Sequence, residues 1–224
     1  VPISRIERMR RGDNLEQGAY GGSVSESDIK SLKDQGYSAA RIGIHPGWIY
    51  SGGNPKSSGI DYYKKVLGYC KKYDIGCILD IHRTASRDLS DYMNDKFVSF
   101  WGKLAKELSS TDPEYAFFEI INEPTPPNRN DMDWYAQQDK VMRAIRENAP
   151  EHTIIIVGSQ CFPDTSPAGG DMGVNWDQID ALMRFKMPKN ITNIVMKTHY
   201  YRPMPFTHQG ADWVDFFGEI KNVK

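Results

Sequence analysis

Polar and ionisable side chains recur at the ends of apolar, strand-like runs along this chain. Arg41 lies within one such run, His82 ends the next, and Glu123 follows a third. His199 and Tyr201 end a later run, and their period-two spacing places both on one face of a strand. Burying a guanidinium, a carboxylate and imidazoles together is costly unless they serve one another or a ligand. We therefore predict one functional site built from the ends of several strands.

These residue types suit carbohydrate chemistry best. A glutamate surrounded by amide, guanidinium, imidazole and phenol groups can protonate a glycosidic oxygen, while aromatic faces stack on sugar rings. A nucleophilic serine site is not indicated, because the sequence has no GxSxG motif. A zinc hydrolase using both histidines is a weaker hypothesis, because no HExxH spacing is present, so we predict no metal and no cofactor.

Each of these residues also has a purely structural interpretation. Arg41 could pair with Glu119 as a structural ion pair, and His82 could be a hydrogen-bonded core histidine. Glu123, which precedes a proline, could cap a helix, and Tyr201 could pack at the rim. These interpretations hold singly, but the clustering favours a shared function.

The elements that must position these residues follow a strand–helix rhythm, which predicts parallel βα units. Runs such as Thr153–Gly158 are almost continuously hydrophobic, as is typical of parallel strands covered on both faces. We expect strands centred near Met9, Arg41, Leu79, Phe118, Ile155 and Val195. We expect helices from a capping box at Ser25–Asp28 to Gly36, and over Asp61–Tyr73, Asp91–Leu108, Asp133–Asn148 and Asn175–Phe185.

The α/β rhythm fits a (β/α)8 TIM barrel better than an open nucleotide-binding sheet. The glycines of Gly18–Gly22 lack the GxGxxG spacing, and there is no P-loop. Because a βα unit takes about 30–40 residues, the 224 residues accommodate about six of the eight units. No linker divides the sequence, so we predict a single domain over residues 1–224, with its site at the carboxyl ends of the strands.

Composition excludes several other classes. The formal net charge is −1 and the pI about 6.6, so the basic excess of a nucleic-acid-binding protein is missing. No apolar run approaches the ~20 residues that cross a bilayer. We interpret Cys70, Cys77 and Cys161 as buried apolar residues, with a Cys70–Cys77 disulfide as the alternative in a secreted chain. No signal peptide is visible, so a cytosolic protein and a processed secreted chain both fit.

Several segments, in order along the chain, resemble glycoside hydrolase family 5, a family of retaining β-glycanases on (β/α)8 barrels. The resemblance implies a metal-independent, secreted endo-β-1,4-glucanase that acts on β-glucan or a related plant polysaccharide. The matching segments are Arg11–Glu16, Ala40–Ile44, Ile78–His82, Phe118–Pro124, Thr198–Tyr201 and Phe206–Trp213.

The resemblance also implies roles for single residues. Glu123 resembles the general acid/base, Asn122 the residue that binds a sugar 2-hydroxyl, and Arg41 the residue that orients the nucleophile. His82, His199 and Tyr201 resemble the polar residues that support the site. The candidates for substrate contacts are His45, Trp48, Trp134 and Trp213, and packing in a helix or at the rim is the alternative for each tryptophan.

One departure from the family pattern concerns the second carboxylate. A retaining mechanism needs two carboxylates about 5–5.5 Å apart, and the family takes its nucleophile from the end of strand seven. Glu219 follows His199 too closely to end such a strand, and Glu119 lies ~13 Å along one strand from Glu123. We therefore expect a C-terminally short chain of low activity that self-associates through unpaired strand edges. The alternative is a non-catalytic carbohydrate-binding protein.

Overall fold

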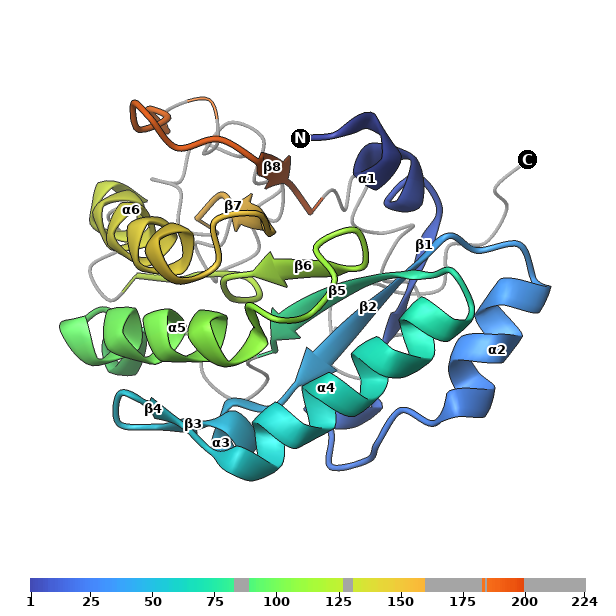
Figure 1. The fold of residues 1–224 in the computed structure, drawn as a ribbon. Coiled ribbons are helices and arrows are strands. Elements are labelled where there is room, and N and C mark those ends of the chain that lie inside the picture. Colours follow the sequence, from blue (N-terminus) through green and yellow to red (C-terminus); the bar gives the residue numbers. More distant parts are fainter. Residues whose placement is uncertain (83–88, 127–130, 160–182, 184, 200–224) are drawn as a thin grey trace, which may run out of the picture.

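A six-stranded parallel sheet forms the centre of the molecule (Figure 1). The computed structural model describes residues 1–82, 89–126, 131–159, 183 and 185–199. Along the sheet the strand order is β1-β2-β5-β6-β7-β8, and every neighbouring pair is parallel. The strands are β1 (Gly12–Leu15), β2 (Ala39–Ile44), β5 (Gly76–Ile81), β6 (Ala116–Glu119), β7 (Thr153–Val157) and β8 (Ile194–Lys197), with β3 (Tyr50–Ser51) and β4 (Asn54–Pro55) forming a separate antiparallel pair.

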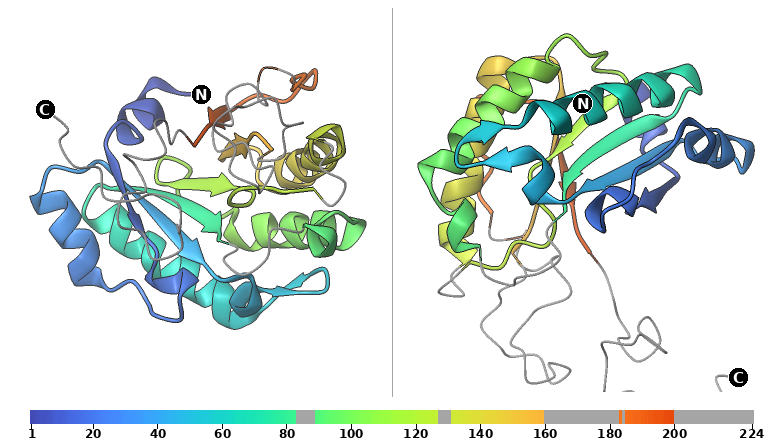
Figure 2. Two further views of the ribbon diagram at one scale, coloured as in Figure 1. Left: turned by 180° about the vertical axis from the view of Figure 1, so that it is seen from behind. Right: turned by 90° about the horizontal axis from the view of Figure 1, so that it is seen from below.

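Helices follow one another along the outer side of the curved sheet, as the view from below shows (Figure 2). This arrangement is a partial (β/α)8 barrel, which confirms the predicted fold class. The helices are α1 (Ile3–Arg8), α2 (Glu26–Asp34), α3 (Pro46–Ile49), α4 (Ser57–Lys72), α5 (Asp95–Leu108) and α6 (Asp131–Asn148), with short 3-10 turns η1 (Gln17–Ala19) and η2 (Ser90–Tyr92).

Local sequence signals fix the helix ends. Ser25 and Asp28 form the predicted capping box at the start of α2, and Gly36 ends it at a φ of 79°. Asn94 accepts backbone hydrogen bonds at the start of α5, so this helix begins at Asp95 and not at the predicted Asp91. The predicted helix over Asn175–Phe185 lies almost entirely outside the described residues.

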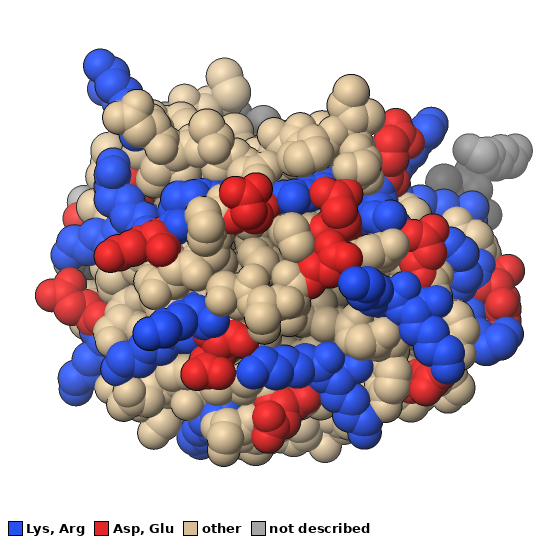
Figure 3. Space-filling view, in the orientation of Figure 1, with Lys and Arg blue, Asp and Glu red and all other residues tan. Residues whose placement is uncertain are grey.

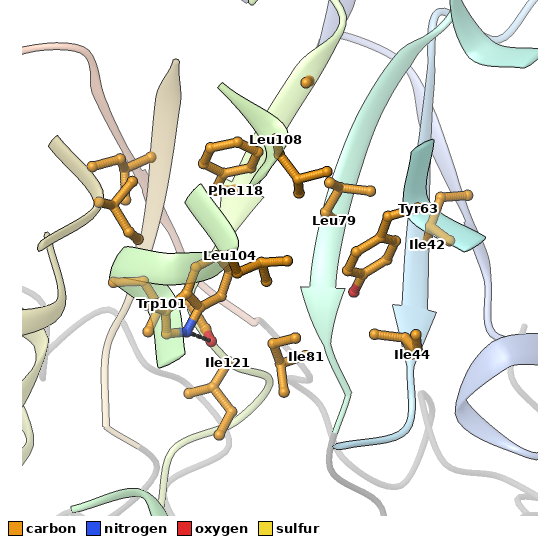
Figure 4. Packing of buried hydrophobic residues seen from close by; sticks show 14 of the residues in the cluster. Ile42, Ile44, Tyr63, Leu79, Ile81, Trp101, Leu104, Leu108, Phe118 and Ile121 are labelled. Atoms are coloured by element: carbon orange, nitrogen blue, oxygen red, sulfur yellow. Dashed lines mark hydrogen bonds between the residues drawn. The ribbon is translucent and has the colours of Figure 1, made fainter. Parts of the chain in front are cut away.

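The apolar core fills the layer between helices and sheet (Figure 4). Trp101, Leu104 and Leu108 of α5 pack here against Phe118 of β6. Trp101 is anchored by a 3.1 Å hydrogen bond from its indole nitrogen to the carbonyl of Ile120. The buried core thus holds the strand ends in fixed positions, which is what a site on those ends requires.

The first strand differs from the prediction. The run around Met9 is not a strand, because Ile3–Arg8 form α1 and Met9 is the residue that caps its carboxyl end. The strand β1 follows at Gly12–Leu15, within the segment that resembles the family's first strand. Its exposed, polar edge position explains why it gives no hydrophobic signal.

Helix α1 closes the amino-terminal end of the barrel through Arg5. The Arg5 guanidinium is buried and donates to Glu114 at 2.8 Å, to the carbonyl of Glu151 at 2.5 Å and to Thr153 Oγ1 at 3.3 Å. Glu114 and Glu151 precede β6 and β7, so one side chain joins the chain terminus to the starts of two strands.

Lysines and arginines alternate with acidic residues over the face shown in Figure 3, without a large patch of one sign. None of the described helices is long and apolar enough to cross a membrane.

Cys70 and Cys77 are free thiols and both are fully buried. Burial, and to a smaller extent the neighbouring Cys70, raises the pKa of Cys77 well above its ordinary value. Cys161 lies outside the described residues.

Candidate functional site

Arg41 is the centre of a buried polar network at the carboxyl ends of the strands. From β2 it forms two parallel hydrogen bonds to Glu119 of β6, Nε to Oε2 at 2.8 Å and Nη2 to Oε1 at 2.6 Å. Its Nη2 also lies 2.7 Å from Asp80 Oδ2 and donates to Asn122 Oδ1 at 2.9 Å. The structural pairing of Arg41 with Glu119 is therefore real, and the same guanidinium reaches the motif that contains Glu123.

Lys197 adds a second cation to this network from β8. Its Nζ lies 2.6 Å from Glu119 Oε1, so the fully buried Glu119 carboxylate is held by two cations. Burial alone would raise the pKa of Glu119, but the charges of Lys197 and Arg41 hold it far below its ordinary value. Burial lowers the pKa of Lys197, although Glu119 opposes that shift. Glu119 is thus an ionised structural anion.

Arg41 stays charged for the corresponding reason. Burial works to lower its pKa, yet the carboxylates of Asp80 and Glu119 raise it well above the ordinary value. Two cations therefore face two buried carboxylates, and the formal charges balance. A balanced network of this kind avoids the large cost of an unpaired buried charge.

His82 is paired with Asp80, two residues before it, which period-two alternation places on the same face of the chain. His82 Nδ1 lies 2.7 Å from Asp80 Oδ2, and both side chains are buried. Asp80 Oδ1 has no hydrogen-bond partner among the described residues. Because Asp80 Oδ2 contacts both His82 Nδ1 and Arg41 Nη2, it connects the imidazole to the rest of the network.

Glu123 lies just beyond β6 and is paired with His199. Its Oε1 lies 2.8 Å from His199 Nδ1, so the carboxyl ends of β6 and β8 meet at this pair. Glu123 has a φ of 42°, a left-handed conformation that is uncommon in residues other than glycine. The next residue, Pro124, further disfavours the right-handed helical conformation at Glu123. Backbone strain of this kind is often concentrated at functional sites.

Asn122 occupies the position between the network and Glu123. It is 6% exposed, and its side-chain oxygen accepts from Arg41. Because the oxygen is engaged, its amide NH2 group is left to donate to another partner. Its backbone N–H donates to the carbonyl of Ile81 at 3.0 Å, which fixes this turn to the end of β5.

The remaining predicted residues have mixed outcomes. Trp134 is fully buried in α6 and donates to the carbonyl of Val157 at 3.0 Å, so of its two interpretations helix packing is confirmed and sugar stacking is wrong. His45 caps α3, where its Nδ1 accepts from Gly47 N–H at 3.0 Å. Trp48, also in α3, is 39% exposed at the carboxyl end of β2. Tyr201, Trp213 and Glu219 lie outside the described residues.

Lys197 belongs to the network but was not predicted from the sequence. The signal available was a lysine that ends the otherwise apolar run Ile194–Met196, where a buried partner would have to be an acid. No group of three or more potential metal ligands occurs within the described parts of the chain. The arrangement consists of one carboxyl group paired with an imidazole, a neighbouring amide, and a charged network that holds both in place.

The protein is built from parallel βα units, and its polar site lies at the carboxyl ends of the strands. This is the arrangement of a (β/α)8-barrel enzyme. Residues 10–222 match the family model described as cellulase (glycosyl hydrolase family 5), and the chain belongs to this family.

The relatives are endoglucanases and related enzymes. The chain is 27% identical over 208 residues to Endoglucanase C of Acetivibrio thermocellus, covering 85% of this chain and 54% of that protein. It is 27% identical over 203 residues to Cellodextrinase A of Ruminococcus flavefaciens, covering 85% and 55%. It thus spans about half the length of these curated relatives. The structure of Thermotoga maritima Cel5A in complex with cellobiose superposes with a TM-score of 0.79 at 25% identity, covering 97% of this chain and 68% of Cel5A.

Proposed function

We propose that the protein is an endo-acting glycoside hydrolase that cleaves β-1,4-linked glucan with retention of configuration, with Glu123 as its general acid/base. The observation that carries the proposal is the Glu123–His199 pair at 2.8 Å on the carboxyl edge of the barrel. The similarity to endoglucanases supports the substrate class. Because a polymeric glucan does not cross a membrane, we also propose that the protein acts outside the cell.

In the proposed reaction Glu123 donates its proton to the glycosidic oxygen as the bond to the anomeric carbon breaks. A nucleophilic carboxylate attacks that carbon and forms a covalent glycosyl–enzyme. Glu123, now ionised, then removes a proton from water, and the resulting hydroxide oxygen displaces the carboxylate from the sugar. His199, which touches Glu123 and not the bond itself, positions the acid/base.

Neither Asp80 nor Glu119 suits the role of nucleophile. Both are fully buried, and both are held by Arg41, with Lys197 as the second cation on Glu119. An anion in such contacts is stabilised against attack on carbon. The retaining mechanism therefore needs a nucleophilic carboxylate other than these two.

Asn122 contributes orientation of the sugar. With its side-chain oxygen bound by Arg41, it presents N–H donors beside Glu123. A hydroxyl of the reacting sugar is the natural acceptor. This hydrogen bond can strengthen as positive charge develops on the ring in the transition state.

The test compares Glu123→Gln with the matched surface variant Glu107→Gln, since Glu107 lies on the exposed side of α5. Hydrolysis of a soluble β-glucan is measured together with the anomer first released from cellotetraose. We expect Glu123→Gln to lower the rate by at least ~100-fold, because the amide cannot supply the acid proton, and Glu107→Gln to leave it unchanged. A wild-type rate in Glu123→Gln would overturn the assignment.

One observation favours a second candidate function. Because the buried carboxylates Asp80 and Glu119 at this edge are held by cations, the chain could bind a glucan without cleaving it. Titration of cellotetraose into the wild-type chain separates the two functions. Saturable binding without turnover supports a carbohydrate-binding protein, whereas turnover supports the hydrolase.

A further inference from the structure

Exposed aromatic side chains are concentrated at one place in the molecule. Among the Phe, Tyr and Trp residues that the structure describes, those exposing more than about a third of their surface are Tyr20 at 69% and Trp48 at 39%. Both follow the carboxyl ends of neighbouring strands, Tyr20 after β1 and Trp48 after β2. Aromatic side chains are common in the lining of ligand sites.

The backbone that carries Tyr20 is rigid. It directly follows η1, where Gly18 accepts a hydrogen bond from the backbone N–H of His45 at 3.0 Å. A side chain at Gly18 would place its Cβ 2.5 Å from the carbonyl oxygen of Gly43 in β2, so only glycine permits this close approach. Ala19 is buried at 3% exposure. The backbone is therefore anchored on the barrel while the Tyr20 ring projects into solvent.

The ring of Tyr20 lies beside the candidate site. Its centroid is 6.3 Å from that of His82, and the two planes are tilted by 55°. Partial burial raises the pKa of the Tyr20 phenol, and the charges of Glu16 and Glu123 add to the shift. The Tyr20 phenol is thus within the electrostatic range of Glu123, the proposed acid/base, although the two residues lie in different loops.

We propose that Tyr20 binds substrate, its exposed ring forming a platform for a pyranose unit of the glucan at the mouth of the site. The inference rests on the proposed function. One face of a β-linked glucose ring presents only C–H groups, which pack against an aromatic face while the equatorial hydroxyls remain in water. Because the Tyr20 backbone is already fixed, little ordering entropy is lost on binding.

The experiment is a calorimetric titration of cellotetraose into the full chain and three variants. Tyr20→Ala removes the platform, and we expect its Kd to rise about tenfold. Tyr20→Phe keeps the ring, and its Kd should stay within about twofold of the wild-type value. Tyr115→Leu is the matched control. Tyr115 is half-buried and directly precedes β6 at the opposite end of the barrel, so this variant should bind as the wild type does.

The outcomes separate the two proposals. If the wild type binds cellotetraose and Tyr20→Ala binds equally well, the platform is wrong and the proposed function stands. If the wild type binds no cello-oligosaccharide at all, the proposed function itself fails. Equal losses in Tyr20→Ala and Tyr20→Phe would overturn the platform too, because they would assign the effect to the hydroxyl group. A thermal unfolding scan of each variant confirms that it is folded.

Discussion

The two ends of the barrel each bury an arginine, and they use it differently. At the amino end, Arg5 binds Glu114 and the backbone of Glu151, which are scaffold groups that precede strands. At the carboxyl end, Arg41 binds two carboxylates and also Asn122, whose neighbour Glu123 is paired with His199. A buried charge therefore does not by itself mark a site. The informative feature is whether its network holds a residue beside a group that can take part in chemistry.

The largest effect is expected from Arg41→Met. Among the described residues, the substitution leaves the fully buried Glu119 with Lys197 alone, and Asp80 with His82 alone. We expect the free energy of unfolding to fall by about 3–5 kcal/mol, with loss of glucan binding because Asn122 is no longer held. Urea denaturation and titration of cellotetraose measure the two effects. Arg41→Lys keeps the charge without the paired hydrogen bonds, so it should fold but bind weakly; full binding in it would contradict the positioning role.

Arg5→Met should separate stability from binding. Its partner Glu114 is 34% exposed, so water replaces part of the lost interaction. We expect a loss of about 2–3 kcal/mol in urea denaturation, smaller than for Arg41→Met. The Kd for cellotetraose should be unchanged at a temperature where the variant is folded. Weakened binding would show that the two ends are not independent.

The amino end should also set the stability of the protein in mild acid. Burial, followed by the charge of Arg5, lowers the pKa of His152 to about 4, and its ring stacks on Phe118. Since the unfolded state binds the proton near its ordinary pKa of about 6.5, the contribution is complete above that pH and is lost as pH falls towards 4. The loss approaches about 3 kcal/mol, by the 1.36 kcal/mol per pKa unit.

Urea denaturation at pH 7 and pH 4.5 measures this effect. His152→Gln should flatten that part of the profile, and Arg5→Met should reduce it because one cause of the shift is removed. A wild-type profile that stays flat between these two pH values would show that His152 titrates normally in the folded protein.

The smallest change in the free energy of unfolding is expected for an exposed ion pair that lies at neither end of the barrel. Lys30 and Asp34 pair on the exposed side of α2 at 2.5 Å. Removing this pair with Lys30→Ala should change the free energy of unfolding by about 0.5 kcal/mol or less, since exposed pairs are weak. Thermal unfolding measures it, and a loss comparable to that of Arg5→Met would contradict the contrast between buried and exposed charges.

Much of the fold could be predicted because the central strands are buried on both faces. The runs around Arg41, Leu79, Phe118 and Ile155 are strands because their side chains have no solvent-facing side. Edge strand β1 could not be located from hydrophobicity, since most of its residues are exposed.

In the candidate site, the sequence predicted which residues lie at the strand ends. It did not predict the contacts that these residues make with side chains from other strands. Asp80 and His82 lie on one face because they are two residues apart on a strand, although period two does not report the 2.7 Å contact between them. The approach of Lys197 to Glu119 crosses from β8 to β6, and no local pattern reports such a distance. Tyr20 was missed because its position depends on the close packing of Gly18 against Gly43, which belongs to tertiary structure.

The left-handed backbone at Glu123 has a consequence for how this sequence changes over generations. Replacing Glu123 by glycine would relieve about 1 kcal/mol of steric cost, so the mutation that removes the acid also makes the chain easier to fold. Neutral drift would therefore favour glycine or asparagine at this position. Glutamate at this position therefore costs stability, as expected of a side chain whose carboxyl group serves function and not the fold.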